Sequence, residues 1–145
     1  MNKNQDHYNK SFVFDKDEDF ALKDTYSFSG GFVGTRKIGD DLYFVTTEYI
    51  PYYLMREENK TVDYVFDLDE YLPTYTVNGQ SATAKYEEIV YVKGTEPTSF
   101  TAFYGINLES SKTTMEVVLG EAGYNLYVSQ DNIYLAGTVY EYDQT

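Results

Sequence analysis

The sequence predicts an all-β fold, and three observations lead to this prediction. The chain holds 17 Tyr and 9 Phe, and aromatic and β-branched residues are enriched in strands. Short apolar stretches are separated by Gly, Asp and Asn turns along most of its length. No stretch shows the periodicity of an amphipathic helix longer than about two turns. At 145 residues the chain has the size of one domain.

The first part of the chain reads as strands joined by turns. Residues 1–10 are polar and aperiodic, and we expect them to form a flexible segment. Gly30 and Gly31 can adopt positive φ angles, so the chain is expected to reverse there, and Gly39 begins the next turn. The expected strands are residues 11–14, 20–28, 32–38 and 42–47.

Residues 48–97 lack this regular alternation of short strands and turns, and they are predicted to form an insertion. It contains three prolines and several charged residues, and it is rich in tyrosine. A structureless loop of this length is unusual in a compact domain, so we expect the insertion to pack against the sheets through its aromatic rings. Regular strands are expected again at residues 88–92, 100–108, 113–119, 124–129 and 133–140.

The two ends of the chain share an internal repeat. The stretch DDLYFVTT at residues 40–47 matches DNIYLAGT at residues 131–138, with Leu42 on Ile133 at an offset of 133 − 42 = 91. Each copy is predicted to be a four-stranded antiparallel meander, the size of one propeller blade. A single domain over residues 11–145 would then hold units 11–47 and 98–142 around the insertion. The alternative is that any two meanders rich in Tyr, Val and Thr align this well.

Charge and composition exclude several classes of function. With 11 Lys and Arg against 24 Asp and Glu, the net charge is −13, which disfavours nucleic acid and anionic membranes as partners. The chain has no Cys, so disulfides and thiol nucleophiles are excluded. No apolar run reaches the length of a transmembrane helix, and residues 1–10 lack the apolar region of a signal peptide. Either the protein is cytosolic or an export signal precedes these residues.

Two groups of residues are candidate sites. Asp15, Asp17 and Asp19 could bind Ca²⁺, although the loop lacks the glycine and the final glutamate of an EF-hand and also fits a plain charged turn. A second group could form a platform for sugars or peptides, or could simply anchor the insertion. It consists of Tyr49, Tyr52, Tyr53 and Tyr75. The only histidine, His7, lies in the polar start, which argues against His-based catalysis.

Four stretches in order resemble a known family. They are SGGFVGTRKIGDDLYFVTTEYIPYY at residues 29–53, LPTYTVNG at 72–79, SFTAFYGINL at 99–108 and VVLGEAGYNLYVSQDNIYLAGTVYEY at 117–142. They resemble secreted bacterial and archaeal proteins with a C-terminal β-propeller domain distantly related to WD40 repeats. The resemblance implies a secreted or cell-surface location and a partial propeller of about two blades. Its open sheet edges would be covered by the insertion or by self-association. The resemblance supplies no catalytic residues.

The expected function is therefore a non-enzymatic extracellular or cell-envelope scaffold that presents loops to a protein or glycan. One alternative is a carbohydrate-binding module that uses the tyrosines of the insertion. The other is an extracellular hydrolase with acidic residues as general acid and base, although sequence alone does not select a pair among 24 carboxylates.

Overall fold

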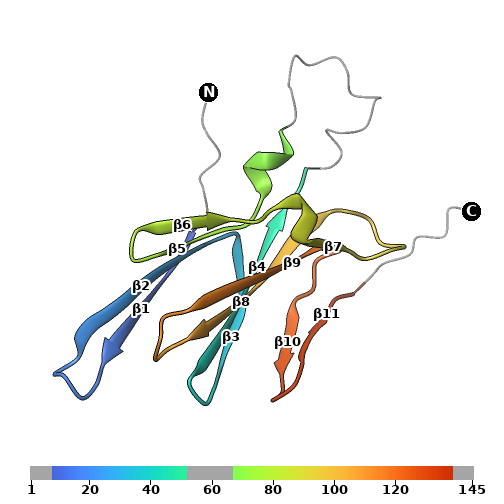
Figure 1. Cartoon of the computed structure of the whole chain (residues 1–145). Coiled ribbons are helices and arrows are strands. Elements are labelled where there is room, and N and C mark those ends of the chain that lie inside the picture. Colours follow the sequence, from blue (N-terminus) through green and yellow to red (C-terminus); the bar gives the residue numbers. More distant parts are fainter. Residues whose placement is uncertain (1–7, 52–66, 139–145) are drawn as a thin grey trace, which may run out of the picture.

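The computed structural model describes residues 8–51 and 67–138. These residues form eleven strands and two short 3₁₀ helices, which confirms the all-β prediction (Figure 1). The strands are β1 (Tyr8–Asp15), β2 (Ala21–Ser29), β3 (Gly31–Ile38), β4 (Asp41–Tyr49), β5 (Thr74–Val77), β6 (Gln80–Thr83), β7 (Ile89–Tyr91), β8 (Ser99–Asn107), β9 (Thr113–Gly120), β10 (Asn125–Val128) and β11 (Ile133–Ala136). The helices are η3 (Leu68–Tyr71) and η4 (Tyr86–Glu88).

The strands form two sheets and a separate hairpin. Sheet 1 has the order β1-β2-β5-β6, sheet 2 has the order β3-β4-β8-β9-β7, and β10 pairs with β11. All pairings are antiparallel except that of β7 with β9. In Figure 1 the β1–β2 hairpin and the β10–β11 hairpin lie at opposite ends of the molecule, with sheet 2 between them. Strand β1 begins before the expected start at residue 11.

The predicted grouping of strands into blades needs a correction. Sheet 2 contains a four-stranded antiparallel meander, β3-β4-β8-β9, but two of its strands come from each predicted unit. The predicted reversal at Gly30 and Gly31 does not pair β2 with β3. Gly30, at a φ of +86°, instead redirects the chain from sheet 1 into sheet 2, where Gly31 lies opposite Thr47. Unit 11–47 is therefore divided between the two sheets.

Strand registers agree with the predicted internal repeat. In the first hairpin Ser11 lies opposite Tyr26, and in β8–β9 Ala102 lies opposite Val117, each 91 residues later. The same offset relates the Thr35–Phe44 pair of β3–β4 to the Leu126–Leu135 pair of β10–β11. Each copy therefore consists of one hairpin in one sheet followed by a second hairpin outside that sheet.

The described part of the insertion packs onto both sheets, as expected. The β5–β6 hairpin extends sheet 1 through β2, and β7 extends sheet 2 through β9. Tyr71 and Tyr75 pack against the buried core together with Leu68 of η3. The carboxylate of Asp67 accepts a hydrogen bond from the Asp69 amide at 3.0 Å and so caps η3. This part of the insertion is thus a structural component of the two sheets.

An aromatic core joins sheet 1 to sheet 2. Phe28 of β2 is 0% exposed, and its ring lies 4.5 Å from that of Phe44 and 4.6 Å from that of Tyr104. Ala102 and Ile106 of β8 are also fully buried. Burial of apolar surface is the main favourable term in folding. The packing of these aromatic rings therefore holds the two sheets together.

A buried carboxylate adds a polar contact between the same sheets. Asp24 of β2 is 5% exposed and accepts hydrogen bonds from Asn78 Nδ2 at 2.8 Å and from Ser111 Oγ at 2.7 Å. Asn78 lies in the β5–β6 turn of sheet 1, and Ser111 lies in the β8–β9 turn of sheet 2. Lys23 reinforces the contact by donating to the Leu108 carbonyl at 2.6 Å. The two turns are therefore held together through β2.

Burial of Tyr104 predicts a loss of stability at alkaline pH. Desolvation raises the pKa of Tyr104 from 10.0 to about 12. The hydroxyls of Thr46 and Ser29 oppose this rise, although neither lies in the geometry of a full hydrogen bond. Below about pH 10 the phenol is neutral in both states; above it the unfolded chain ionises first, and stability falls by about 1.4 kcal/mol per pH unit until about pH 12.

Urea unfolding between neutral and alkaline pH measures this effect. Tyr104→Phe keeps the ring but removes the ionisable group, so its stability should fall less steeply above pH 10 than that of the unmodified chain. The stability of Tyr104→Phe should still fall somewhat at alkaline pH, because burial also raises the pKa of Tyr26. Identical pH profiles of the two proteins would contradict the assignment.

Candidate binding surface

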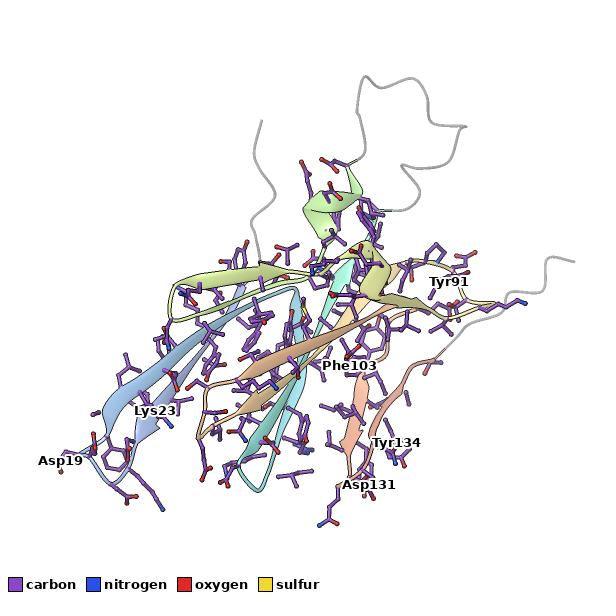
Figure 2. All side chains as sticks on the ribbon, in the orientation of Figure 1. Asp19, Lys23, Tyr91, Phe103, Asp131 and Tyr134 are labelled. Carbon is purple, nitrogen blue, oxygen red and sulfur yellow. The ribbon has the colours of Figure 1, made fainter. Side chains whose placement is uncertain are left out.

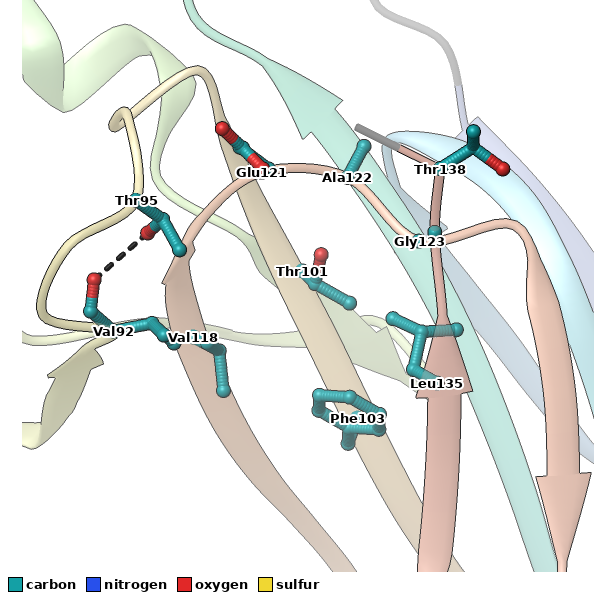
Figure 3. Close-up of a pocket in the computed structure, with 11 residues that line it drawn as sticks. Val92, Thr95, Thr101, Phe103, Val118, Glu121, Ala122, Gly123, Leu135 and Thr138 are labelled. Carbon is teal, nitrogen blue, oxygen red and sulfur yellow. Dashed lines mark hydrogen bonds between the residues drawn. The ribbon is translucent and has the colours of Figure 1, made fainter. Parts of the chain in front are cut away.

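A pocket of about 270 Å³ lies between sheet 2 and the β10–β11 hairpin (Figure 3). Thr101 and Phe103 of β8 and Val118 of β9 form its sheet side, and Leu135 of β11 faces them. Because side chains alternate along a strand, Phe103 points away from the face that carries Tyr104. The pocket therefore lies on the side of sheet 2 opposite the aromatic core.

Two glycines shape the packing here: Gly34 of sheet 2 faces the hairpin, and Gly123 lies at the start of the hairpin against β11. A Cβ atom at Gly34 of β3 would be 2.8 Å from Cδ2 of Leu126, and one at Gly123 would be 2.5 Å from Cγ of Leu135. Both distances are shorter than van der Waals contact, so larger residues would move the leucines or the hairpin. The shape of the pocket thus depends on these two positions.

The pocket is mainly apolar with a few polar groups. Thr95 and Thr101 place hydroxyl groups on its wall, and the Thr95 hydroxyl already donates to the Val92 carbonyl at 2.7 Å (Figure 3). Of the described residues that line the pocket, Glu121 is the one that carries a carboxylate. This combination suits an apolar group with one or two hydrogen-bonding atoms.

Two tyrosines lie next to the pocket, and we call them the tyrosine rim: Tyr49 at the end of β4, and Tyr124, which follows the pocket residue Gly123. Their hydroxyl oxygens are 2.5 Å apart. Burial of the Tyr49 hydroxyl and its hydrogen bond to Tyr124 raise the pKa of Tyr49 to about 12. Both rings remain more than half exposed, so the tyrosine rim presents aromatic surface to a ligand.

The structure separates Tyr75 from Tyr49, another tyrosine of the predicted platform. Tyr75 contacts Tyr104 edge-on at 5.8 Å and lies against the core, away from Tyr49. Tyr52 and Tyr53 lie outside the described residues. The sequence reasoning overlooked Tyr124, because it concentrated on the insertion. The alternation in the predicted strand 124–129 was the signal that could have identified an exposed tyrosine there.

The hairpin carries a second aromatic pair that sequence reasoning also missed. Tyr127 of β10 lies directly opposite Tyr134 of β11, and their ring centroids are 5.8 Å apart. Both side chains are exposed, and Tyr134 is visible on the outer side of the hairpin in Figure 2. Leu126, next to Tyr127, faces sheet 2, so this pair lies on the face turned away from the pocket.

The three candidate calcium ligands lie in and beside the β1–β2 turn. The Asp15 carboxylate accepts a hydrogen bond from the Asp17 amide at 2.9 Å, and Asp19 lies at the tip of the hairpin with a φ of +52° (Figure 2). In residues 8–51 and 67–138 no group of three or more His, Asp or Glu side chains has the arrangement of a metal site. Calcium binding by these aspartates stays a prediction.

The wider surface near the pocket is apolar. Val90, Tyr91 and Val92, in β7 and the turn after it, are all exposed, and Val92 also lines the pocket. Neither of the helices described here is long and apolar enough to cross a membrane. The pocket, the tyrosine rim, Val90 and Val92 together form the candidate binding surface.

Comparison with known proteins identifies the family. A model of the beta propeller domain family matches residues 5–145, which is nearly the whole chain. No match was found among the curated proteins or among the solved structures. The family match agrees with the repeated hairpins and the antiparallel meander of sheet 2. This chain belongs to the beta propeller domain family.

Proposed function

We propose that this protein is a non-enzymatic β-propeller scaffold that binds a peptide segment of a partner protein at the candidate binding surface. The observation that supports this function is the apolar pocket with two exposed tyrosines beside it, Tyr49 and Tyr124. Exposed tyrosines beside a concave apolar site are typical of protein-binding hot spots.

The chemistry of the pocket supports binding rather than hydrolysis. A glycosidase needs two carboxylates about 5–10 Å apart, whereas Glu121 is the sole carboxylate among the described lining residues. The net charge of −13 favours a partner segment that is neutral or basic. An exported or cell-surface location is part of the proposal and rests on the resemblance to secreted bacterial and archaeal proteins.

The test is selection of binding peptides from a displayed random library, followed by affinity measurement on variants. Tyr124→Ala should weaken peptide binding about tenfold or more, because a buried aromatic anchor contributes over 1 kcal/mol. Tyr127→Ala is the matched control, since Tyr127 is equally exposed but lies on the other face of the hairpin. Peptides that bind both variants as tightly as the unmodified chain would contradict the proposed site.

A glycan partner is the second candidate, and the exposed Tyr127–Tyr134 pair favours it. Sugars stack on the faces of exposed aromatic rings, and these two rings lie side by side on the outside of the hairpin. Polysaccharide binding lost in Tyr127→Ala but retained in Tyr124→Ala would assign a glycan to this pair. The opposite pattern with peptides would assign a protein to the pocket.

A further inference from the structure

The internal repeat indicates what the open edges of the two terminal hairpins can bind. Strand β4 ends the first copy of the repeat and pairs with β8, which begins the second. In this contact Phe44 lies opposite Tyr104, and Val45 lies opposite Phe103. The molecule thus contains one example of how the last strand of one copy pairs with the first strand of the next.

In residues 8–51 and 67–138 the corresponding strands of the two outer hairpins each have a partner strand on one edge only. Strand β11 is the counterpart of β4, and β1 is the counterpart of β8, by the same offset of 91 residues. Among the described residues β11 pairs only with β10, and β1 pairs only with β2. Within the described part of the chain, each therefore presents a row of backbone amide and carbonyl groups with no strand beside it, where its counterpart is paired.

We propose that β11 of one molecule pairs with β1 of a second copy of this chain, in the antiparallel register of β4 and β8. Moving that register by 91 residues places Leu135 opposite Val13, and Ala136 opposite Phe12. Tyr134 then lies opposite Phe14, giving an aromatic cross-strand pair of two side chains that are exposed in one molecule. A four-stranded antiparallel sheet β10-β11-β1-β2 results, with the strand arrangement of β3-β4-β8-β9.

Geometry and charge define what kind of assembly this contact forms. Figure 2 shows Asp19, at the tip of the β1–β2 hairpin, and Asp131, at the tip of the β10–β11 hairpin, at opposite ends of the molecule. A contact between two different surfaces is heterologous, so it produces closed rings or open chains. Each copy carries a net charge of −13, so mutual repulsion opposes assembly and salt should promote it. The contact uses the edges of β11 and β1.

The absence of cysteine makes disulfide cross-linking a direct test. An Ala136→Cys protein mixed with a Phe12→Cys protein under oxidising conditions should form a disulfide-linked dimer, because opposed residues of paired strands have the Cα separation that a disulfide requires. Neither variant alone should cross-link efficiently, since each thiol then faces a residue that is not cysteine. The yield of the mixture should rise with ionic strength.

The matched control is Ala136→Cys mixed with Ser81→Cys, because Ser81 is an exposed residue of β6 at the opposite edge of sheet 1. Pairing in the proposed register predicts roughly tenfold more linked dimer with Phe12→Cys than with Ser81→Cys. Light scattering on the unmodified chain should also show a mass that increases with concentration. Equal yields in the two mixtures, or a chain that stays monomeric at every concentration and ionic strength, would overturn the proposal. The edges of β1 and β11 would then be available to a different protein instead.

Discussion

Phe28→Ala is expected to lower the free energy of unfolding by about 3–5 kcal/mol, the range for removing a fully buried Phe side chain. Phe28 is 0% exposed and contacts rings on both sides of the interface between the sheets, including Phe44 at 4.5 Å and Tyr104 at 4.6 Å. Its removal would leave a cavity lined by rigid aromatic rings, which relax poorly. A domain of this size has a total stability of about 5–15 kcal/mol, so the loss would be a large fraction of it.

Urea denaturation followed by tyrosine fluorescence or circular dichroism measures this loss. Phe20→Ala is the matched control, because Phe20 is 71% exposed in the β1–β2 turn and its truncation should change stability by less than about 0.5 kcal/mol. If the two variants were equally stable, the aromatic contact could not be what joins sheet 1 to sheet 2.

Gly30→Ala should destabilise the protein by about 2–4 kcal/mol, which combines two effects. Gly30 has a φ of +86°, a region that alanine adopts at a cost of about 1–2 kcal/mol. In addition, a Cβ atom at this position would be 2.9 Å from the Thr47 carbonyl oxygen, which belongs to the backbone of β4 and cannot rotate away. The chain would have to open the junction between β2 and β3 to accommodate the methyl group.

Gly79→Ala separates the two effects. Gly79 has a φ of +85°, nearly identical to that of Gly30, but no atom lies within 4 Å of its hypothetical Cβ. This variant should therefore show only the conformational cost of about 1–2 kcal/mol. Thermal and urea unfolding of both variants give the comparison, and the excess loss in Gly30→Ala measures the clash. Equal losses in the two proteins would show that the β2–β3 junction tolerates a side chain.

Local features of the fold could be predicted from the sequence, whereas the grouping of hairpins could not. Alternating apolar residues and turn glycines identify strands such as β3 and β4, since both signals act over a few residues. The pairing of β4 with β8 depends instead on contacts such as Phe44 with Tyr104, which are distant in sequence. The Gly30–Gly31 pair has the composition of a reversal, and only the surrounding structure decides that the chain continues into a second sheet.

The candidate site, too, could be predicted from the sequence only in part. Sequence reasoning selected Tyr49 because it lies among other tyrosines, and the structure pairs it with Tyr124, which is 75 residues away. No local pattern predicts that contact, because it arises when the β10–β11 hairpin lies on sheet 2. The pocket itself depends on Gly34 and Gly123, whose role is visible only when Leu126 and Leu135 face them.

The β4–β8 pairing also determines the order in which this protein can fold. Tyr49 pairs with Ser99 and Asp41 pairs with Asn107, separations of 99 − 49 = 50 and 107 − 41 = 66 residues. Closing such long loops is slow, so the local hairpins should form first and the central sheet later, in milliseconds to seconds. During synthesis the β3–β4 hairpin emerges with the edge of β4 unpaired, and it stays so until the ribosome has passed Asn107. The period before β8 arrives is the time at which the nascent chain is most exposed to aggregation.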